Sequence, residues 1–383
     1  MKTCSPTDSG LAPSDQKRLD RLIEKLERNR PSSIGYPCNQ VWDYSSLYRF
    51  LQFSINNVGD PFQRTLVRLN THEFEREVVE DFANLTQADP EDRWGYVTAG
   101  GTEGNMYGMY LARELYPNGI VYFSEEAHYS VPKILRLQHT RNIMIRSQPN
   151  GEMDYDDLRE SIRIHRDVPP IIFANVGTTM RGAVDDVSKI KAIIKELSIP
   201  AYYIHSDAAL SGMILPFVDD PQSWNFADGA DSISISGHKL IGAPLPCGVV
   251  MARRSHVDRV ARSVEYVGVE DTTIMGSRNA FTPLLLWYAL RTLRASGLRN
   301  IVDQSVEIAD YAIEKLKEIG VEAWRNPNSV TVVFPRPPES LMEKWVIAPD
   351  REIGHIITLP PVDRNVIDSF VTDFANALRS TNH

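Results

Sequence analysis

Short apolar runs alternate with amphipathic stretches through the middle of the chain. The runs read as buried strands that end in small or polar residues, over 94–98, 120–124, 170–175, 201–207, 231–236 and 247–253. Between them, apolar residues recur at helical spacing over 74–85, 102–116, 154–164 and 186–197. Strands that alternate with crossover helices predict an α/β fold with a mostly parallel central sheet. The pattern leaves the direction of the strand at 247–253 open.

The two ends of the chain show a different pattern. An amphipathic helix is predicted after Ser14, and two further helices over 283–295 and 300–319. Strands at 321–326, 329–334 and 355–359 precede a last helix at 366–378. Residues 264–273 are polar and predict an irregular, mobile loop. We therefore expect an N-terminal helical segment (1–70), a large cofactor-binding domain (71–285) and a small α+β C-terminal domain (286–383).

Asp207 and Lys239 each follow a predicted strand. In an open α/β sheet, ligands bind at the carboxyl ends of the strands, so these two side chains can converge on one small molecule. A lysine amine forms a Schiff base with an aldehyde, and a carboxylate facing a pyridine nitrogen keeps that ring protonated and electron-accepting. The pair suggests pyridoxal 5'-phosphate as cofactor. Taken alone, the pair is equally consistent with a helix cap and a surface lysine.

A pair of glycines, Gly100 and Gly101, separates the strand at 94–98 from the helix that follows. Glycines allow close approach of the backbone, and a helix N-terminus presents free N–H groups, so this turn is a candidate phosphate cradle. Thr102 and Asn105 can add side-chain donors.

Other candidate contacts follow neighbouring strands. His128 comes just after the strand at 120–124 and can lie flat against a planar ring. Thr178 ends the next strand on the same edge as Asp207, and the small Ala209 leaves room for a ring. Tyr36, in a Gly-Tyr-Pro turn, is a candidate substrate contact. For each of these residues, an ordinary loop or core role is the alternative.

Composition narrows the class of protein. The 383 residues carry a net charge of −9, which argues against general nucleic-acid binding and favours a small-molecule partner. The three cysteines are widely separated, and the nine histidines show no His-x-x-x-His spacing, so neither a disulfide framework nor a metal site is indicated. Without an apolar signal core or a run of about 18 apolar residues, we expect a cytoplasmic protein that does not enter a membrane.

Several motifs occur in a characteristic order. They are Phe53-Ser-Ile-Asn-Asn57, Trp94-Gly-Tyr-Val-Thr98, Gly100-Gly-Thr-Glu-Gly-Asn105, Pro170-Ile-Ile-Phe-Ala-Asn175, Asp207-Ala-Ala, Ser236-Gly-His-Lys239, Gly276-Ser-Arg-Asn279 and Ala323-Trp-Arg-Asn326. With them, nearly the whole chain resembles the pyridoxal-phosphate-dependent group II amino acid decarboxylases of fold type I, in particular the bacterial histidine and plant serine decarboxylases.

The resemblance implies a role for each cofactor contact. Lys239 would bind the cofactor covalently, Asp207 would pair with the pyridine N–H, and His128 would stack on the ring. The phosphate would be held by Gly101, Thr102, Ser236 and His238. Thr178 and Ala209 would support the ring.

The resemblance also implies a catalytic loop and a dimer. Tyr266 matches a family tyrosine that returns a proton to Cα after carbon dioxide leaves. Tyr36, Ser277 and Phe281 are expected to contact the substrate. Family members are homodimers whose active sites draw loops from both subunits, so we expect an amino acid substrate and a second copy of the chain as partners.

One departure from the family pattern concerns the substrate. In the histidine and serine enzymes, Gly-Ser-Arg-Asn is followed by Gly-His, whereas Ala280 and Phe281 follow it here. If Phe281 lines the pocket, the sequence favours a substrate less polar than histidine, such as leucine, methionine or an aromatic amino acid, or a small one such as serine; otherwise the change is a packing variation. An aminotransferase, an aldolase-type lyase and a cofactor-retaining binding protein remain as alternatives to a decarboxylase.

Overall fold

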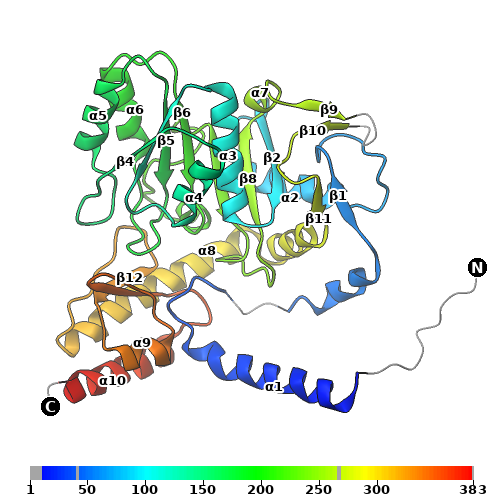
Figure 1. Cartoon of the computed structure of the whole chain (residues 1–383). Helices are drawn as coiled ribbons and strands as arrows, with labels where there is room; N and C mark the ends of the chain where they lie inside the picture. Colours follow the sequence, from blue (N-terminus) through cyan, green and yellow to red (C-terminus); the bar gives the residue numbers. More distant parts are fainter. Residues whose placement is uncertain (1–10, 40–42, 265–268, 382–383) are drawn as a thin grey trace, which may run out of the picture.

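A computed structural model of the chain describes residues 11–39, 43–264 and 269–381. Its main feature is a seven-stranded sheet of order β2-β8-β7-β6-β5-β3-β4 (Figure 1). The strands are β2 Arg93–Thr98, β3 Ile120–Ser124, β4 Asn142–Ile145, β5 Pro170–Asn175, β6 Tyr203–Asp207, β7 Ser232–Ser236 and β8 Gly248–Arg253. Only β8 runs antiparallel to its neighbours, β2 and β7. The mostly parallel α/β sheet is confirmed, and the direction of 247–253 is settled.

Helices cover both faces of this sheet. They are α2 His72–Leu85, α3 Gly101–Leu115, α4 Ser130–Leu137, α5 Tyr155–Ile164, α6 Val187–Glu196 and the short α7 Arg254–Val257. On one face, Trp94 and Tyr96 of β2 pack with Tyr107 of α3. On the other face, Ile172 of β5 packs with residues of α5 and α6 such as Ile190. Both faces are apolar, which explains the continuous apolar runs in the sequence.

Two aspartates set the starts of α5 and α6. Asp154 accepts hydrogen bonds from the backbone N–H groups of the second and third residues of α5, at 3.0 Å each. Asp186 caps α6 in the same way. The predicted helices at 154–164 and 186–197 are therefore confirmed, with their first residues acting as N-caps.

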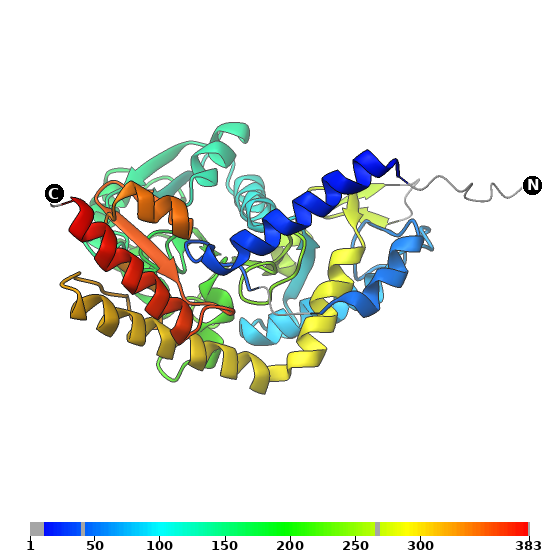
Figure 2. The ribbon, with the colours of Figure 1, turned by 90° about the horizontal axis from the view of Figure 1, so that it is seen from below.

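A second, antiparallel sheet lies at the C-terminal end, in the order β12-β14-β13. This region comprises α8 Phe281–Glu318, β12 Thr331–Pro335, α9 Glu339–Trp345, β13 Pro349–Asp350, β14 Ile353–Ile357 and α10 Arg364–Thr381. Seen from below, α8 runs along one edge of the molecule, in contact with α2 and then β12, and α10 lies next to its C-terminal half (Figure 2). The two helices predicted at 283–295 and 300–319 are confirmed as the two halves of α8, which meet at Arg294, where the backbone is not helical (φ 56°, ψ 178°). The strand predicted at 321–326 is wrong, because only Trp324 forms an isolated bridge with Val333.

The remaining elements lie outside the two larger sheets and their main helices. They are α1 Pro13–Asn29, η1 Arg30–Ser32, η2 Ser45–Gln52, β1 Asn56–Val58, η3 Ser211–Met213, η4 Leu215–Phe217, β9 Arg262–Val264, β10 Val269–Asp271 and β11 Ser277–Asn279. β1 pairs with β11, and β9 with β10, both antiparallel. The expectation of an irregular segment over 264–273 is therefore corrected at β10. Tyr266 lies outside the described residues. Among the described helices, none combines the length and apolar character needed to cross a bilayer.

Candidate active site

The parallel strands β6 and β7 bring Asp207 and Lys239 to the same edge of the large sheet. Asp207 is the last residue of β6, and Lys239 follows three residues after the end of β7. Both residues line a cavity of about 590 Å³ at this edge. The predicted contacts that line it with them are Tyr36, Gly101, Thr102, His128, Thr178, Ala209, Ser236 and His238. The cavity lies within the size range of small-molecule sites.

Burial makes the Lys239 amine a better nucleophile. Desolvation lowers the pKa of Lys239 from 10.5, and the nearby Asp207 carboxylate opposes part of this shift. A lowered pKa increases the neutral fraction of the amine at a given pH, and only the neutral amine attacks a carbonyl carbon.

The Asp207 carboxylate is held by a chain of buried hydrogen bonds. Asn105 Nδ2 donates to Asp207 Oδ2 at 2.8 Å, and the Ala209 backbone N–H donates to Oδ1 at 3.2 Å. The other amide atom of Asn105, Oδ1, lies 3.0 Å from His205 Nε2. On the far side of the ring, His205 Nδ1 lies 2.7 Å from Ser232 Oγ. Burial lowers the pKa of His205 to about 3, so the ring is neutral at ordinary pH. Because an amide oxygen only accepts, the His205 proton lies on Nε2, which donates to Asn105 Oδ1. This bond leaves Asn105 Nδ2 facing Asp207.

Two glycines allow α3 to approach the sheet closely enough for this contact. A Cβ on Gly104 would collide with Ser234, and one on Gly108 would collide with His205. The sequence suggested that Asn105 adds a donor to the phosphate cradle. In the structure, Asn105 Nδ2 instead donates a hydrogen bond to the Asp207 carboxylate.

The N-terminus of α3 forms the end of the cavity near Ser236. A Cβ on Gly101 would lie 3.0 Å from Ser236 Oγ, so the glycine keeps the helix start close to the tip of β7. Free N–H groups at a helix start favour an anion. His238 lines the same cavity, and its Nδ1 lies 2.8 Å from the Cys247 carbonyl oxygen.

Two further cavity residues are fixed by local contacts. His128 Nδ1 lies 2.8 Å from Ser130 Oγ, and burial lowers the pKa of His128, although the Asp207 charge acts in the opposite direction. Thr178 Oγ1 accepts a hydrogen bond from the Ala183 backbone N–H at 3.0 Å. The stacking role of His128 and the ring contact of Thr178 stay predictions.

The single chain does not bring Ser277 and Phe281 to this cavity. Ser277 is exposed on β11, where its Oγ accepts from Asn56 Nδ2 at 3.1 Å. Phe281 is 9% exposed and packs in the apolar core beside Leu284 and Leu285. Neither residue lines the cavity. Their substrate contacts, like the proton-transfer role of Tyr266, stay predictions.

Comparisons with known proteins identify the family. A sequence profile of the "Pyridoxal-dependent decarboxylase conserved domain" matches residues 105–335. The chain is 46% identical over 369 residues to a histidine decarboxylase of Mesorhizobium japonicum, covering 96% of this chain and 100% of the relative. The chain belongs to the pyridoxal-dependent decarboxylases. A histidine decarboxylase of Pseudomonas entomophila is 48% identical over 366 residues, which is 95% of this decarboxylase and 91% of the relative.

Solved structures share the fold. L-methionine decarboxylase of Streptomyces sp. 590 superposes with a TM-score of 0.86 at 27% identity, with 96% of each chain covered. Glutamate decarboxylase of Lactobacillus brevis superposes with a TM-score of 0.80 at 18% identity, covering 99% of this chain and 95% of the other. The chain therefore has the fold of the fold type I enzymes. Its membership of the decarboxylase family favours decarboxylation over the aminotransferase, aldolase-type lyase and binding-protein alternatives.

The cavity fits the cofactor of this family, pyridoxal 5'-phosphate. It offers a reactive amine at Lys239, a fixed carboxylate at Asp207, and a helix N-terminus with Gly101 for an anionic group. An aldehyde, a pyridine nitrogen and a phosphate are the three groups that such a set of contacts suits.

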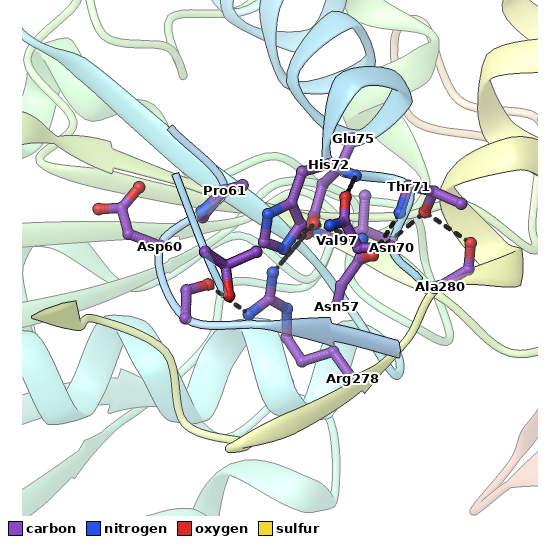
Figure 3. Close-up of polar contacts among 12 residues, drawn as sticks. Asn57, Asp60, Pro61, Asn70, Thr71, His72, Glu75, Val97, Arg278 and Ala280 are labelled. Atoms are coloured by element: carbon purple, nitrogen blue, oxygen red, sulfur yellow. Dashed lines mark hydrogen bonds and ion pairs between the residues drawn. The ribbon is translucent and has the colours of Figure 1, made fainter. Parts of the chain in front are cut away.

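A buried polar network supports the Gly-Ser-Arg-Asn motif of this decarboxylase (Figure 3). Arg278 Nη2 donates to both carboxylate oxygens of Glu75, at 3.1 and 2.9 Å. Glu75 also accepts from Asn57 Nδ2 at 2.7 Å and from the Val97 backbone N–H at 2.9 Å. The network joins α2 and β2 to the β1–β11 pair, and therefore fixes Ser277 and Asn279 on either side of Arg278.

Sequence reasoning missed the part of the cavity wall that comes from the C-terminal sheet and its preceding turn. These residues are Ser329, Val330, Thr331, His355 and Ile357. It also missed Cys38 and Glu126 in the same wall. No local motif marks these residues, because their role depends on contacts between distant segments.

Proposed function

We propose that this decarboxylase converts L-histidine to histamine and carbon dioxide. The supporting observation is the identity of 46–48% to histidine decarboxylases along at least 95% of this chain. When bound, pyridoxal phosphate supplies the electron sink that accepts the electron pair left at Cα as the carboxylate departs. The chain must bind the amino acid, orient its Cα–carboxylate bond and return a proton to Cα.

Each of these tasks has a candidate residue. Lys239, whose pKa is lowered by burial, would supply the amine that reacts with the aldehyde carbon. Asp207 would hold a proton at the pyridine nitrogen, with Asn105 orienting its carboxylate. All the other candidate cofactor contacts line the same cavity. In this proposal the phosphate would be held by Gly101, Thr102, Ser236 and His238, and the ring would be contacted by His128, Thr178 and Ala209. Tyr266, or His128 through water, then delivers the proton to Cα.

A methionine-type substrate is the second candidate. The structure of L-methionine decarboxylase superposes over 96% of this chain, and the cavity wall includes the apolar side chains of Leu210, Ile214, Val330 and Ile357. A less polar substrate would find more contacts on that part of the wall than on the polar part.

A substrate panel tests both candidates. The holoenzyme is mixed with histidine, serine, leucine, methionine and aromatic amino acids, and amine and carbon dioxide are measured for each. The proposal expects the highest kcat/KM for histidine. A higher value for methionine would replace histidine with the second candidate, and keto acid without carbon dioxide would contradict decarboxylation.

We further propose that the chain acts as a homodimer in the cytosol. In support, α1 buries none of its residues, and its apolar side chains Leu19, Leu22, Ile23 and Leu26 are 46–60% exposed. A contiguous exposed apolar surface is typical of a site of interaction with another protein. Cys38 and Cys247 are free thiols, as is usual in reducing compartments. Sedimentation of the holoenzyme at micromolar concentration is expected to give twice the chain mass, and a monomer mass would contradict the dimer.

A further inference from the structure

Asp185 is a buried carboxylate behind the wall of the cavity. It is 0% exposed and does not line the cavity itself. Its Oδ2 accepts hydrogen bonds from the Asn175 backbone N–H at 2.7 Å and from Asn175 Nδ2 at 3.0 Å. Its Oδ1 accepts from the Met153 backbone N–H at 2.7 Å. Burial raises the pKa of Asp185 to about 6, and these three hydrogen bonds oppose the shift, so the side chain is mostly ionised at neutral pH.

These contacts fix the orientation of the Asn175 side chain. An ionised carboxylate only accepts, so the amide nitrogen of Asn175, and not its oxygen, faces Asp185. Nδ2 also donates to Ser124 Oγ at 3.1 Å, which uses its second hydrogen. Both amide hydrogens therefore point into the protein. The amide oxygen, Oδ1, is left without a partner among the residues that the structure describes.

Asn175 Oδ1 is open to the cavity. Asn175 lines the cavity, and Oδ1 is not one of the unpartnered polar atoms that the protein encloses completely. Asn175 ends β5 and is the register partner of Asp207, which ends β6. Neighbouring strands lie about 4.8 Å apart. The two residues therefore reach the cavity from adjacent positions on one edge of the sheet.

We propose that Asp185 is a positioning residue, which holds the Asn175 amide with its oxygen toward the ring hydroxyl of bound pyridoxal phosphate. The inference rests on the proposed function and extends its cofactor site by two residues. The cofactor ring carries two groups that donate hydrogen bonds, the protonated pyridine nitrogen and the hydroxyl. Asp207 takes the first in the proposed arrangement, which leaves the hydroxyl for the neighbouring Asn175. An acceptor there stabilises the protonated hydroxyl over its anion.

The absorbance of the holoenzyme reports the charge state of the ring hydroxyl, so its titration with pH gives a readout that does not depend on catalysis. Asn175→Ala removes the proposed acceptor. Asp185→Asn replaces the carboxylate by an amide of the same shape that can donate, so the Asn175 amide is free to turn and present Nδ2 to the cavity. Asp186→Asn is the matched control, because it makes the same change one residue along, at the N-cap of α6.

We expect the spectral transition to move to lower pH by about one unit in Asn175→Ala, which corresponds to the tenfold change in proton affinity that one hydrogen bond supplies. In Asp185→Asn it should move in the same direction by at least as much, because a donor then faces the ring oxygen. Asp186→Asn should leave the transition unchanged. A purely structural role of Asp185 would lower the free energy of unfolding in Asp185→Asn without a spectral shift.

The other outcomes contradict specific parts of the proposal. No shift in Asn175→Ala, or a shift to higher pH, would overturn the contact with the cofactor. A shift in Asn175→Ala without one in Asp185→Asn would overturn the positioning role of Asp185.

A crystal structure of the wild-type holoenzyme decides if Asp185→Asn does not fold. A separation above about 3.5 Å between Asn175 Oδ1 and the hydroxyl oxygen contradicts the hydrogen bond. A pyridine nitrogen that lies away from Asp207 would refute the cofactor contacts of the proposed function. An intact Asp207 contact without the Asn175 contact refutes this inference alone.

Discussion

The Asn105 amide donates a 2.8 Å hydrogen bond to Asp207 Oδ2, and so connects the first turn of α3 to the tip of β6. The other end of the amide faces the His205 ring, which is neutral and fully buried. The carboxylate therefore has one fixed orientation before any ligand binds, which is the arrangement that an electrostatic contact to a pyridine nitrogen requires.

Replacing Asn105 by alanine should loosen Asp207 and leave His205 Nε2–H without an acceptor. We expect a loss of about 1–3 kcal/mol in the free energy of unfolding, together with a fall in kcat that exceeds the change in KM. Urea unfolding and steady-state kinetics measure the two effects. Asn142→Ala, at an exposed position on β4, is the control. An unchanged kcat in Asn105→Ala would remove the amide from the positioning of Asp207.

The buried neutral His205 should make stability depend on pH. The unfolded chain takes up a proton at this side chain as the pH falls through about 6.5, whereas the folded chain does so only near its lowered pKa of about 3. The stability contribution of the neutral ring is thus complete above about pH 6.5 and falls on acidification, by up to about 1.4 kcal/mol per pH unit.

Urea unfolding at pH 7 and pH 5 tests this dependence. His205→Gln should lose less stability than the wild type between the two values, although buried His355, whose pKa is also lowered, to about 4, contributes to both proteins. His139→Asn, at an exposed position, should follow the wild type. Parallel curves for wild type and His205→Gln would show that His205 does not carry the effect.

The ion pair between Glu75 and Arg278 should contribute far more than a surface pair. Their side chains are 1% and 3% exposed, so Arg278→Met leaves an unpaired charge inside the protein at a cost of about 3–5 kcal/mol. The double variant Glu75→Gln/Arg278→Met should lose less than the sum of the single losses, because no charge remains unpaired.

The exposed pair Glu160–Arg163, with side chains 56% and 60% exposed, is the comparison. Arg163→Met should cost no more than about 1 kcal/mol by urea unfolding. Equal costs for Arg163→Met and Arg278→Met would contradict the importance of the buried network for β11.

Replacing Phe281 by histidine tests the departure from the family motif. Phe281 packs among leucines at the start of α8, so an imidazole there should lower the free energy of unfolding by about 1–3 kcal/mol. We expect the order of kcat/KM values across the amino acid panel to stay the same. A rise of histidine relative to methionine would instead place residue 281 in contact with the substrate.

The sequence was sufficient to predict the strand ends and the residues on them. Asp207 ends β6 and Lys239 follows β7, and these two neighbouring strands are parallel, which brings their carboxyl ends together. Gly101 follows β2, which runs in the same direction as β7 because both pair antiparallel with β8. The pattern did not resolve the direction of β8, because an apolar run has no direction. It did indicate two helices after residue 281, and the non-helical Arg294 separates them.

The side-chain partners could not be predicted in the same way. Asn105 was assigned to the phosphate cradle because it follows a glycine turn, yet its partner Asp207 lies 102 residues away in the sequence. His355 has its hydrogen bond to Gly35 over 320 residues. Spacing along one helix or strand contains no information on such contacts, which arise only when sheets pack together.

Residues 34–39 join the C-terminal sheet to the turn that holds Lys239, with hydrogen bonds to Ile357, His355 and Lys239. A hinge motion that moved the C-terminal sheet away from Lys239 would have to break the hydrogen bonds at one end of this segment. The segment also packs closely on the C-terminal region at Gly35, where even a methyl group would collide with the backbone of Val346. The C-terminal sheet and the turn that holds Lys239 are therefore expected to move together as one unit, with Tyr36 of the connecting segment in the wall of the cavity between them.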